Sequence, residues 1–251
     1  MNVVIAGVQQ ANAPNAVIIN IASIAIIVIF AGHIKGYQMQ LHEQYRPKDF
    51  SEVVGQDKAI TKIRSLAKRG LGGRAFWISG QSGTGKTTIA RLLAAQIAEA
   101  MHIEELDATD LSAARLRDIE QSMAVFGFGQ KNGRVYIINE AHGLNKAAIR
   151  QLLVLLERLP SHTAIIFTTT AEGQELLFTE QEDTAPLLSR CIQIELARRD
   201  LAKAFAQRAM EIAQTENLDG KPIGAYLTLV QKYRNNMRAV LQAIEAGEML
   251  E

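Results

Sequence analysis

The chain has 251 residues, enough for one large domain or for a core domain with a small appendage, which excludes small scaffolds held together by disulfides. Hydrophobic residues make up 48% of the sequence and charged residues 21%, which is typical of a folded protein and excludes a disordered or fibrous one. The net charge of +1 does not indicate a nucleic-acid partner, so bound DNA or RNA would require a local basic face or backbone amides at helix starts. The single cysteine, Cys191, cannot form an internal disulfide, and the five histidines show no metal-ligand spacing. These counts predict a reducing, cytoplasmic setting without a structural zinc site.

The first shift in composition lies near the N-terminus. Residues 16–34 are nineteen residues without a charge, rich in isoleucine and valine. As a helix this segment would span roughly 28 Å, close to the apolar thickness of a bilayer, but its β-branched residues suit a buried strand equally well. Three interpretations of residues 1–38 therefore stay open: an extension upstream of a biological start at Met39, a membrane anchor, and an added strand or hairpin. A membrane is not the favoured partner, because the segment lacks the basic start and the cleavage site of a secretory signal.

From residue 39 short apolar strands alternate with amphipathic helices, the pattern of an α/β domain. Strands are predicted at Phe76–Ser79, Ile103–Leu106, Val135–Ile138, Ala164–Thr168 and Ile192–Leu196. Apolar residues at helical spacing predict helices over Ile89–Ile97 and Ile149–Leu156, and three short helical patterns follow residue 199. We therefore expect an α/β domain at 39–198, with a central parallel sheet flanked by helices, and a small helical domain at 199–251.

A glycine-rich turn follows the strand that ends at Ser79. It reads Gly80-Gln-Ser-Gly-Thr-Gly-Lys-Thr87 and fits the pattern Gly-x4-Gly-Lys-[Ser/Thr] at the start of a helix. Glycines let successive backbone amides point at phosphate oxygens, and the helix start adds the positive end of its dipole. Lys86 can reach the outer phosphates, and the Thr87 hydroxyl can ligate Mg²⁺. The predicted phosphate-binding residues are Gly80, Gly83, Thr84, Gly85, Lys86, Thr87 and Thr88.

A nucleotide hydrolase also needs acidic residues at the end of a buried strand. The strand Val135–Ile138 is followed by Asn139 and Glu140. Glu140 is the candidate general base, although it could also be an exposed acid at a strand end. Asn139 stands where an aspartate is expected beside Mg²⁺, so we expect nucleotide binding with a weakened hold on the metal and slower turnover.

Together with the turn, seven further motifs make the chain resemble a clamp-loader-type AAA+ ATPase, as in replication factor C small subunits and the bacterial DNA polymerase III gamma/tau subunit. The motifs are Glu43-Gln-Tyr-Arg-Pro-Lys48, Val53-Val-Gly-Gln56, Glu105-Leu-Asp-Ala-Thr-Asp110, Asn139-Glu-Ala-His142, Phe167-Thr-Thr-Thr170, Ser189-Arg-Cys191 and Asn236-Met-Arg238. The resemblance runs from about Leu41 to Met249 and implies an AAA+ P-loop core followed by a helical lid.

The resemblance also implies roles for individual residues. Those that would wrap the adenine and ribose of ATP are Tyr45, Arg46, Val53 and Val54. Thr170 matches sensor 1, which reports on the terminal phosphate, and Arg238 matches sensor 2 on the lid. Arg190 matches the arginine finger, which serves the ATP of a neighbouring subunit. The alternatives are an ordinary strand-end threonine and two surface arginines in solvated pairs.

The implied function is an ATP- and Mg²⁺-dependent ATPase of DNA replication, which assembles with other AAA+ subunits and holds a sliding clamp and primer–template DNA without reading sequence. DNA contact would fall near the helix start at Asp110–Arg117 and near Lys131 and Arg134. Two departures from the family weigh on this function: Asn139, and a chain that ends after the lid, before the family's helical collar. They keep open a regulatory or scaffolding module with little turnover, or a related AAA+ DNA motor. The segment from Glu172 to Pro186 is longer than the corresponding loop of the family.

Overall fold

The computed structural model describes residues 39–180, 184–197 and 199–250. The predicted N-terminal extension, residues 1–38, lies outside them. Within the described residues, no helix is both long enough and apolar enough to cross a membrane.

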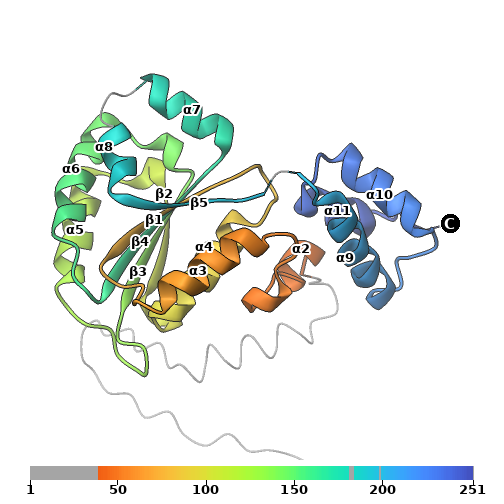
Figure 1. The fold of residues 1–251 in the computed structure, drawn as a ribbon, viewed down its shortest axis with the longest axis horizontal. Helices are drawn as coiled ribbons and strands as arrows, with labels where there is room; N and C mark the ends of the chain where they lie inside the picture. Colours follow the sequence, from red (N-terminus) through yellow and green to blue (C-terminus); the bar gives the residue numbers. More distant parts are fainter. Residues whose placement is uncertain (1–38, 181–183, 198, 251) are drawn as a thin grey trace, which may run out of the picture. The chain divides into compact units, whose positions relative to one another are not determined.

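The centre of the fold is a five-stranded parallel sheet with strand order β2-β3-β4-β1-β5 (Figure 1). The strands are β1 (Arg74–Ser79), β2 (Ile103–Asp107), β3 (Arg134–Asn139), β4 (Thr163–Thr169) and β5 (Cys191–Glu195). All five lie where the sequence predicts them, and the predicted parallel sheet is confirmed. Because the register pairs Ser79 with Thr169 and Asp107 with Asn139, the carboxyl ends of these strands meet at one edge of the sheet.

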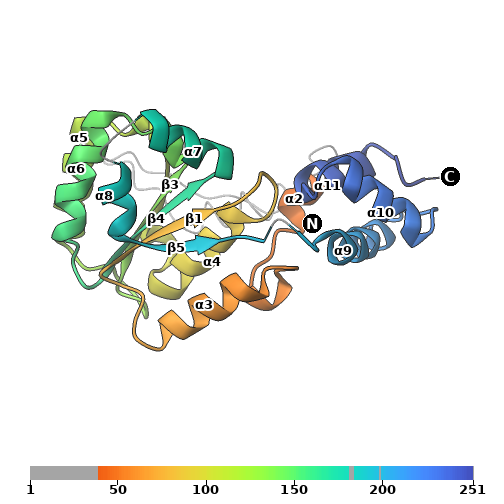
Figure 2. The same ribbon diagram turned by 45° about the horizontal axis from the view of Figure 1, so that its top comes forward.

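Helices cover both faces of the sheet (Figures 1 and 2). Alternate residues of β1 face opposite sides: Trp77 packs on the face of α5 (Ala113–Met123) and α6 (Lys146–Glu157), whereas Phe76 and Ile78 pack on the face of α3 (Asp57–Ala67) and α4 (Lys86–Ile97). The three central strands, β3, β4 and β1, are buried on both faces, as is typical of a parallel sheet in an α/β protein, whereas the edge strands β2 and β5 are partly exposed. Short helical turns complete the connections: α2 (Leu41–Gln44), η1 (Phe50–Glu52), η2 (Ala100–His102), η3 (Ala108–Asp110) and η4 (Ala141–Gly143).

The segment after β4 is helical. It forms α7 (Ala171–Glu180) and α8 (Thr184–Ser189), and Leu177 and Leu187 join the core on the α6 face. In the residues that the structure describes, the segment Glu172–Pro186 is therefore mostly helical rather than a long loop, and it adds two helices to that face.

Three C-terminal helices build a separate hydrophobic core. They are α9 (Ala202–Thr215), α10 (Ile223–Lys232) and α11 (Met237–Glu245), as the three helical patterns predict. Phe205, Tyr226 and Ile244 are among the side chains buried between them, and Leu41 of α2 joins the same core. The N-terminal segment Leu41–Val54 therefore bridges the helical region and the sheet domain, and this is where the pocket lies.

Candidate nucleotide-binding site

The glycine turn leads from β1 directly into α4. Gly83 (φ +74°) and Gly85 (φ +98°) adopt the left-handed backbone conformation that glycine tolerates best. Gly85 is also the N-cap of α4 and has no side chain to cap the helix, so the first amides of α4 remain available to an anion. The loop is braced from within, because the Thr84 hydroxyl donates a 2.7 Å hydrogen bond to the Gln81 carbonyl. This arrangement is a preformed cradle for phosphate.

Lys86 supplies the positive charge of the cradle. Its side chain is buried, and Nζ donates to the Gln81 carbonyl at 3.2 Å. Burial lowers the pKa of Lys86, while the nearby Glu140 carboxylate opposes that shift. A buried ammonium held mainly by a backbone carbonyl would gain strongly from an anionic ligand.

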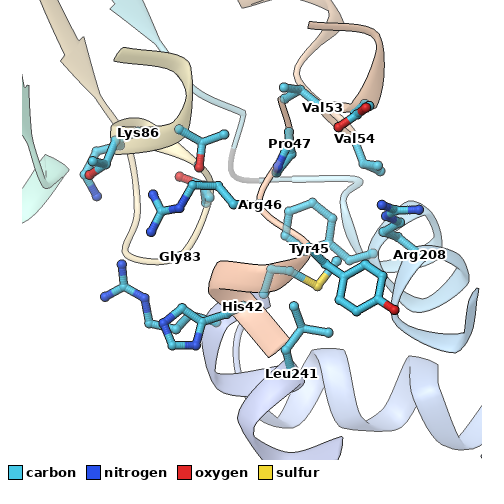
Figure 3. A pocket seen from close by; sticks show the side chains of 18 of the residues that line it. His42, Tyr45, Arg46, Pro47, Val53, Val54, Gly83, Lys86, Arg208 and Leu241 are labelled. Carbon is cyan, nitrogen blue, oxygen red and sulfur yellow. The ribbon is translucent and has the colours of Figure 1, made fainter. Parts of the chain in front are cut away.

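A pocket of about 1010 Å³, including the space at its mouth, opens beside this turn. Figure 3 shows Lys86 and Gly83 toward one end and Val53, Val54 and Arg208 toward the other. Most of the predicted ligand-binding residues line it: Tyr45, Arg46, Val53, Val54, Gly83, Thr84, Gly85, Lys86, Thr87, Thr88, Glu140 and Arg238. Lys86 and the backbone amides of the turn at one end, and the apolar side chains of Val53 and Val54 at the other, suit a ligand with phosphates at one end and a base at the other.

Other lining residues were not predicted as ligand contacts. They are His42, Pro47, Glu52, Ser82, Phe205, Arg208, Ile212, Met237 and Leu241. Phe205, Ile212 and Leu241 belong to the helical patterns that follow residue 199, and helical spacing does not indicate which of its apolar residues meets a ligand.

The segment before η1 is tied to the helical region. The Tyr45 hydroxyl donates to Glu216 Oε1 at 2.5 Å, and this carboxylate raises the pKa of Tyr45. Arg46 makes an ion pair with Glu43 and thereby lowers the pKa of Glu43. The contact through Glu216 holds the Tyr45 ring in the pocket wall.

Gln56, the last residue of the Val53–Gln56 motif, links the turn to the connection between the sheet and α9. Its buried amide donates to the Thr84 carbonyl at 3.3 Å and accepts from the Ala197 amide at 2.7 Å. A buried amide with both ends bonded fixes the two chain segments relative to each other.

Helix α11 touches the turn directly. The Met237 amide donates to the Gly83 carbonyl at 3.3 Å, and Asn236 caps α11 by accepting from the Ala239 amide. The contact at Met237 brings Arg238, in the first turn of α11, to the lining of the pocket. The predicted lid arginine thus lies beside the phosphate cradle.

The end of β3 places Glu140 and Asn139 differently. Glu140 has a left-handed backbone (φ +50°), lines the pocket, and lies 3.4 Å from Nδ1 of His142. Asn139 does not line the pocket. Its amide oxygen accepts from Thr168 Oγ1 at 2.8 Å, and its amide nitrogen donates to Glu105 Oε1 at 2.6 Å.

Gly80, Thr170 and Arg190 also lie outside the pocket lining. Thr170 Oγ1 accepts from the Gly173 amide at 3.0 Å and so caps α7. Arg190 follows α8, where it forms a 2.5 Å ion pair with Glu157. The predicted roles of Thr170 and Arg190 remain predictions.

Two of the cations near the predicted DNA contact, Arg115 and Arg134, are engaged within the chain. Arg115, in the first turns of α5, forms an ion pair with Glu104, and Arg134 Nε donates to the Val125 carbonyl at 2.7 Å. These contacts reduce the charge that Arg115 and Arg134 can offer a phosphate backbone.

The fold and the site define a P-loop nucleotide-binding protein of the α/β class with a helical C-terminal region. Residues 76–193 match the sequence model of the "ATPase family associated with various cellular activities (AAA)". This part of the chain therefore has the AAA P-loop fold, with the turn at Gly80–Thr87 as the P-loop.

Several characterised proteins that are similar to this chain are subunits of DNA polymerase III. The chain is 27% identical to DNA polymerase III subunit tau of Escherichia coli in an alignment 238 residues long, which covers 84% of this chain and 35% of that protein. It is 30% identical to DNA polymerase III subunit tau/gamma of Haemophilus influenzae, across 72% of this chain and 28% of that protein. The chain thus spans about a third of the length of these relatives. The predicted resemblance to clamp-loader-type AAA+ ATPases is confirmed.

Solved structures agree on the fold. A RuvB mutant from Thermotoga maritima aligns with a TM-score of 0.62 and 22% sequence identity, over 80% of this chain and 64% of that one. At this identity the likeness supports the AAA P-loop fold alone.

Proposed function

We propose that this protein binds and hydrolyses ATP as a subunit of a clamp-loader-like DNA replication complex in the cytoplasm. The observation that carries the proposal is the pocket, which has the buried Lys86 and the glycine turn at one end and the apolar Val53 and Val54 at the other. The similarity of the chain to DNA polymerase III subunits tau and gamma supports a role in replication. ATP bound between adjacent AAA+ subunits would favour a state that holds a sliding clamp and primer–template DNA, and hydrolysis would release them.

The residues of the turn and of β3 fit ATP with Mg²⁺. Lys86 and the amides of the turn would hold the phosphates, while Thr87 and Asn139 would face the metal's coordination sphere. Mg²⁺, when bound, neutralises charge on the phosphate oxygens. Glu140 would accept a proton from the attacking water as the bond between the β-phosphate oxygen and the γ-phosphorus breaks, giving ADP and phosphate.

Arg190 would serve the neighbouring subunit's ATP. Its side chain is partly exposed and lies outside its own pocket, which fits a group that acts between chains. An arginine in this role raises the rate of hydrolysis about 10³–10⁵-fold. Thr170 and Arg238 would report the state of the terminal phosphate to α7 and to the lid.

Turnover measurements test the proposal. ATP hydrolysis is measured with the protein alone, with primed DNA, and with primed DNA plus a sliding clamp. We expect stimulation by each addition and loss of activity in Lys86→Ala. Lack of stimulation by both would refute the clamp-loading part while leaving nucleotide binding intact.

Mixing two inactive variants tests action between subunits. Arg190→Ala lacks the finger, and Lys86→Ala lacks the phosphate site but keeps Arg190. If copies of this chain pair with one another, the mixture should recover activity, because the Lys86→Ala chain supplies Arg190 to its neighbour. An Arg190 that acts in its own chain would give no recovery.

Asn139 favours one second candidate, a regulatory or scaffolding AAA+ module in which ATP is held with little turnover. A neutral amide beside the metal lowers the charge available there. Single-turnover measurements separate the two candidates, because a static module would keep bound ATP intact over the time in which primed DNA and clamp stimulate a motor.

A further inference from the structure

Packing alone does not fix the side chain of Glu140, the candidate general base at the end of β3. Its side chain is 48% exposed, so the carboxylate needs a partner if it is to keep one direction. Of the side chains that the structure describes, only that of His142 forms a hydrogen bond or ion pair with Glu140, and Nδ1 of His142 lies 3.4 Å from Glu140 Oε2. A general base has to face the water whose proton it takes, so this contact bears directly on hydrolysis.

The ring of His142 is held in turn by the neighbouring strand and helix. Its Nδ1 lies 3.3 Å from Oγ1 of Thr169, a fully buried residue at the end of β4. The ring also lies against Gly173 in the first turn of α7, where an added Cβ would stand 2.6 Å from both Cγ and Nδ1 of His142. The end of β4 and the start of α7 therefore fix the place of the ring, and a glycine at position 173 leaves room for it.

The two neighbours of Nδ1 indicate that this nitrogen carries a hydrogen. The Thr169 hydroxyl donates to the Thr170 carbonyl at 3.2 Å, so its oxygen is left to accept a hydrogen bond from His142. The ionised carboxylate of Glu140 can only accept. With an acceptor on either side, the neutral ring is expected as the Nδ1–H tautomer, whose single hydrogen is shared between Thr169 and Glu140.

We infer that His142 is a positioning residue for the proposed hydrolysis: its Nδ1–H directs the Glu140 carboxylate into the pocket, while Thr169 and Gly173 hold the ring. The inference rests on the proposed ATPase function. Glu140 lines the pocket and His142 does not, so His142 acts through Glu140 rather than on the ligand. The 3.4 Å separation is long for a hydrogen bond, as catalytic contacts often are before the substrate is bound, and it should shorten with ATP in place.

Single-turnover hydrolysis of radiolabelled ATP, together with the Kd of a fluorescent non-hydrolysable analogue, tests this role. His142→Leu keeps a side chain of roughly similar size without a donor, and it should slow hydrolysis ~10–100-fold at an unchanged Kd. His142→Asn puts an amide nitrogen near the place of Nδ1 and should recover most of the rate. A wild-type rate in His142→Leu, no recovery in His142→Asn, or a Kd that weakens in step with the rate would overturn the inference.

His102→Leu is the matched control. His102 also makes a ring hydrogen bond, since its Nε2 accepts from the Phe128 amide at 2.7 Å, but it precedes β2 at the edge of the sheet opposite the phosphate cradle. His102→Leu should keep the wild-type rate, and a loss equal to that of His142→Leu would overturn the inference.

A double-mutant cycle shows whether His142 acts through Glu140. In a Glu140→Gln background, His142→Leu should slow the residual hydrolysis by less than about twofold, because the base that it positions is already absent. The same fold-loss in both backgrounds would mean that the two residues act independently and would overturn the inference.

The contact can also be measured without turnover. We expect ¹⁵N NMR at about pH 8.5, with His142→Asn used for assignment, to show His142 as the Nδ1–H tautomer, and Glu140→Ala to shift its Nδ1 resonance. The Nε2–H tautomer, or an Nδ1 resonance that Glu140→Ala leaves in place, would overturn the inference whatever the rate of hydrolysis. Failure of the wild type to bind the analogue or to hydrolyse ATP would instead refute the proposed function.

Discussion

Gly83 is the position at which the turn and α11 approach most closely, and Gly83→Ala tests that approach. A Cβ at Gly83 would lie 2.9 Å from the Asn236 Cα and closer still to the Asn236 side-chain amide. The left-handed backbone of Gly83 costs an alanine about 1–2 kcal/mol. Displacing Asn236 would also remove the cap of α11, about 1 kcal/mol, and the hydrogen bond from the Met237 amide, again about 1 kcal/mol.

Gly70→Ala is the matched control. Gly70 has a similar backbone (φ +83°), but nothing lies within 4 Å of a Cβ built there. We therefore expect the free energy of unfolding to fall by about 1–2 kcal/mol in Gly70→Ala and by about 3–4 kcal/mol in Gly83→Ala. In a chain of this length the difference corresponds to a further drop in Tm of roughly 4–8 °C.

Urea denaturation followed by tryptophan fluorescence measures both variants, because Trp77, the single tryptophan, is buried in the sheet core. Repeating Gly83→Ala in an Asn236→Ala background should reduce its cost by about 1 kcal/mol, since the cap is already lost. Equal losses for Gly83→Ala and Gly70→Ala would refute the close approach of α11 to the P-loop.

Three further predictions concern packing and ionisation. Leu152 is fully buried under the sheet, so Leu152→Ala should lower the free energy of unfolding in urea by about 2–5 kcal/mol. Val154→Ala, on the exposed face of α6, should change it by less than about 0.5 kcal/mol. Similar losses in the two variants would contradict the packing. Burial raises the pKa of Cys191 from 9.0 to about 12, so the folded protein favours the neutral thiol. The neutral thiol therefore contributes fully to the stability of the folded protein below pH 9, and this contribution is lost as the pH rises toward 12. Alkylation of Cys191 at about pH 8 should be far slower in the native protein than in urea. Equal alkylation rates would contradict that burial. Tyr45→Phe removes the hydrogen bond to Glu216 and should lower the free energy of unfolding by about 0.5–1.5 kcal/mol. Nucleotide affinity should stay unchanged because the ring remains in the pocket wall. A tenfold weaker affinity would instead show that the hydroxyl itself contacts the ligand.

The sheet and the turn could be predicted because their signals are local. Phe76–Ser79 is an apolar run followed at once by glycines and Lys86, and strand, loop and helix follow in the order that the pattern requires. The same locality placed Glu140 at the end of β3, where it lines the pocket.

The rest of the site depends on contacts between segments far apart in the chain. Phe205 and Leu241 were predictable as apolar helix residues, but only the docking of α9 and α11 turns them toward the pocket. Glu105 and Asn139 are 34 residues apart and meet through the parallel pairing of β2 with β3, so the sequence alone could describe Asn139 only as a missing charge. The role proposed for Arg190 would involve the ATP of a neighbouring subunit, which a single chain does not contain.

We propose that the turn ending at Lys86 binds the triphosphate of ATP. Equilibrium titration of the wild type and of Lys86→Ala with a fluorescent ATP analogue tests it most directly. We expect saturable binding to the wild type and an affinity at least tenfold lower for Lys86→Ala, a difference in binding free energy of about 1.4 kcal/mol or more. Identical uptake by the two proteins, or none by the wild type, would contradict it.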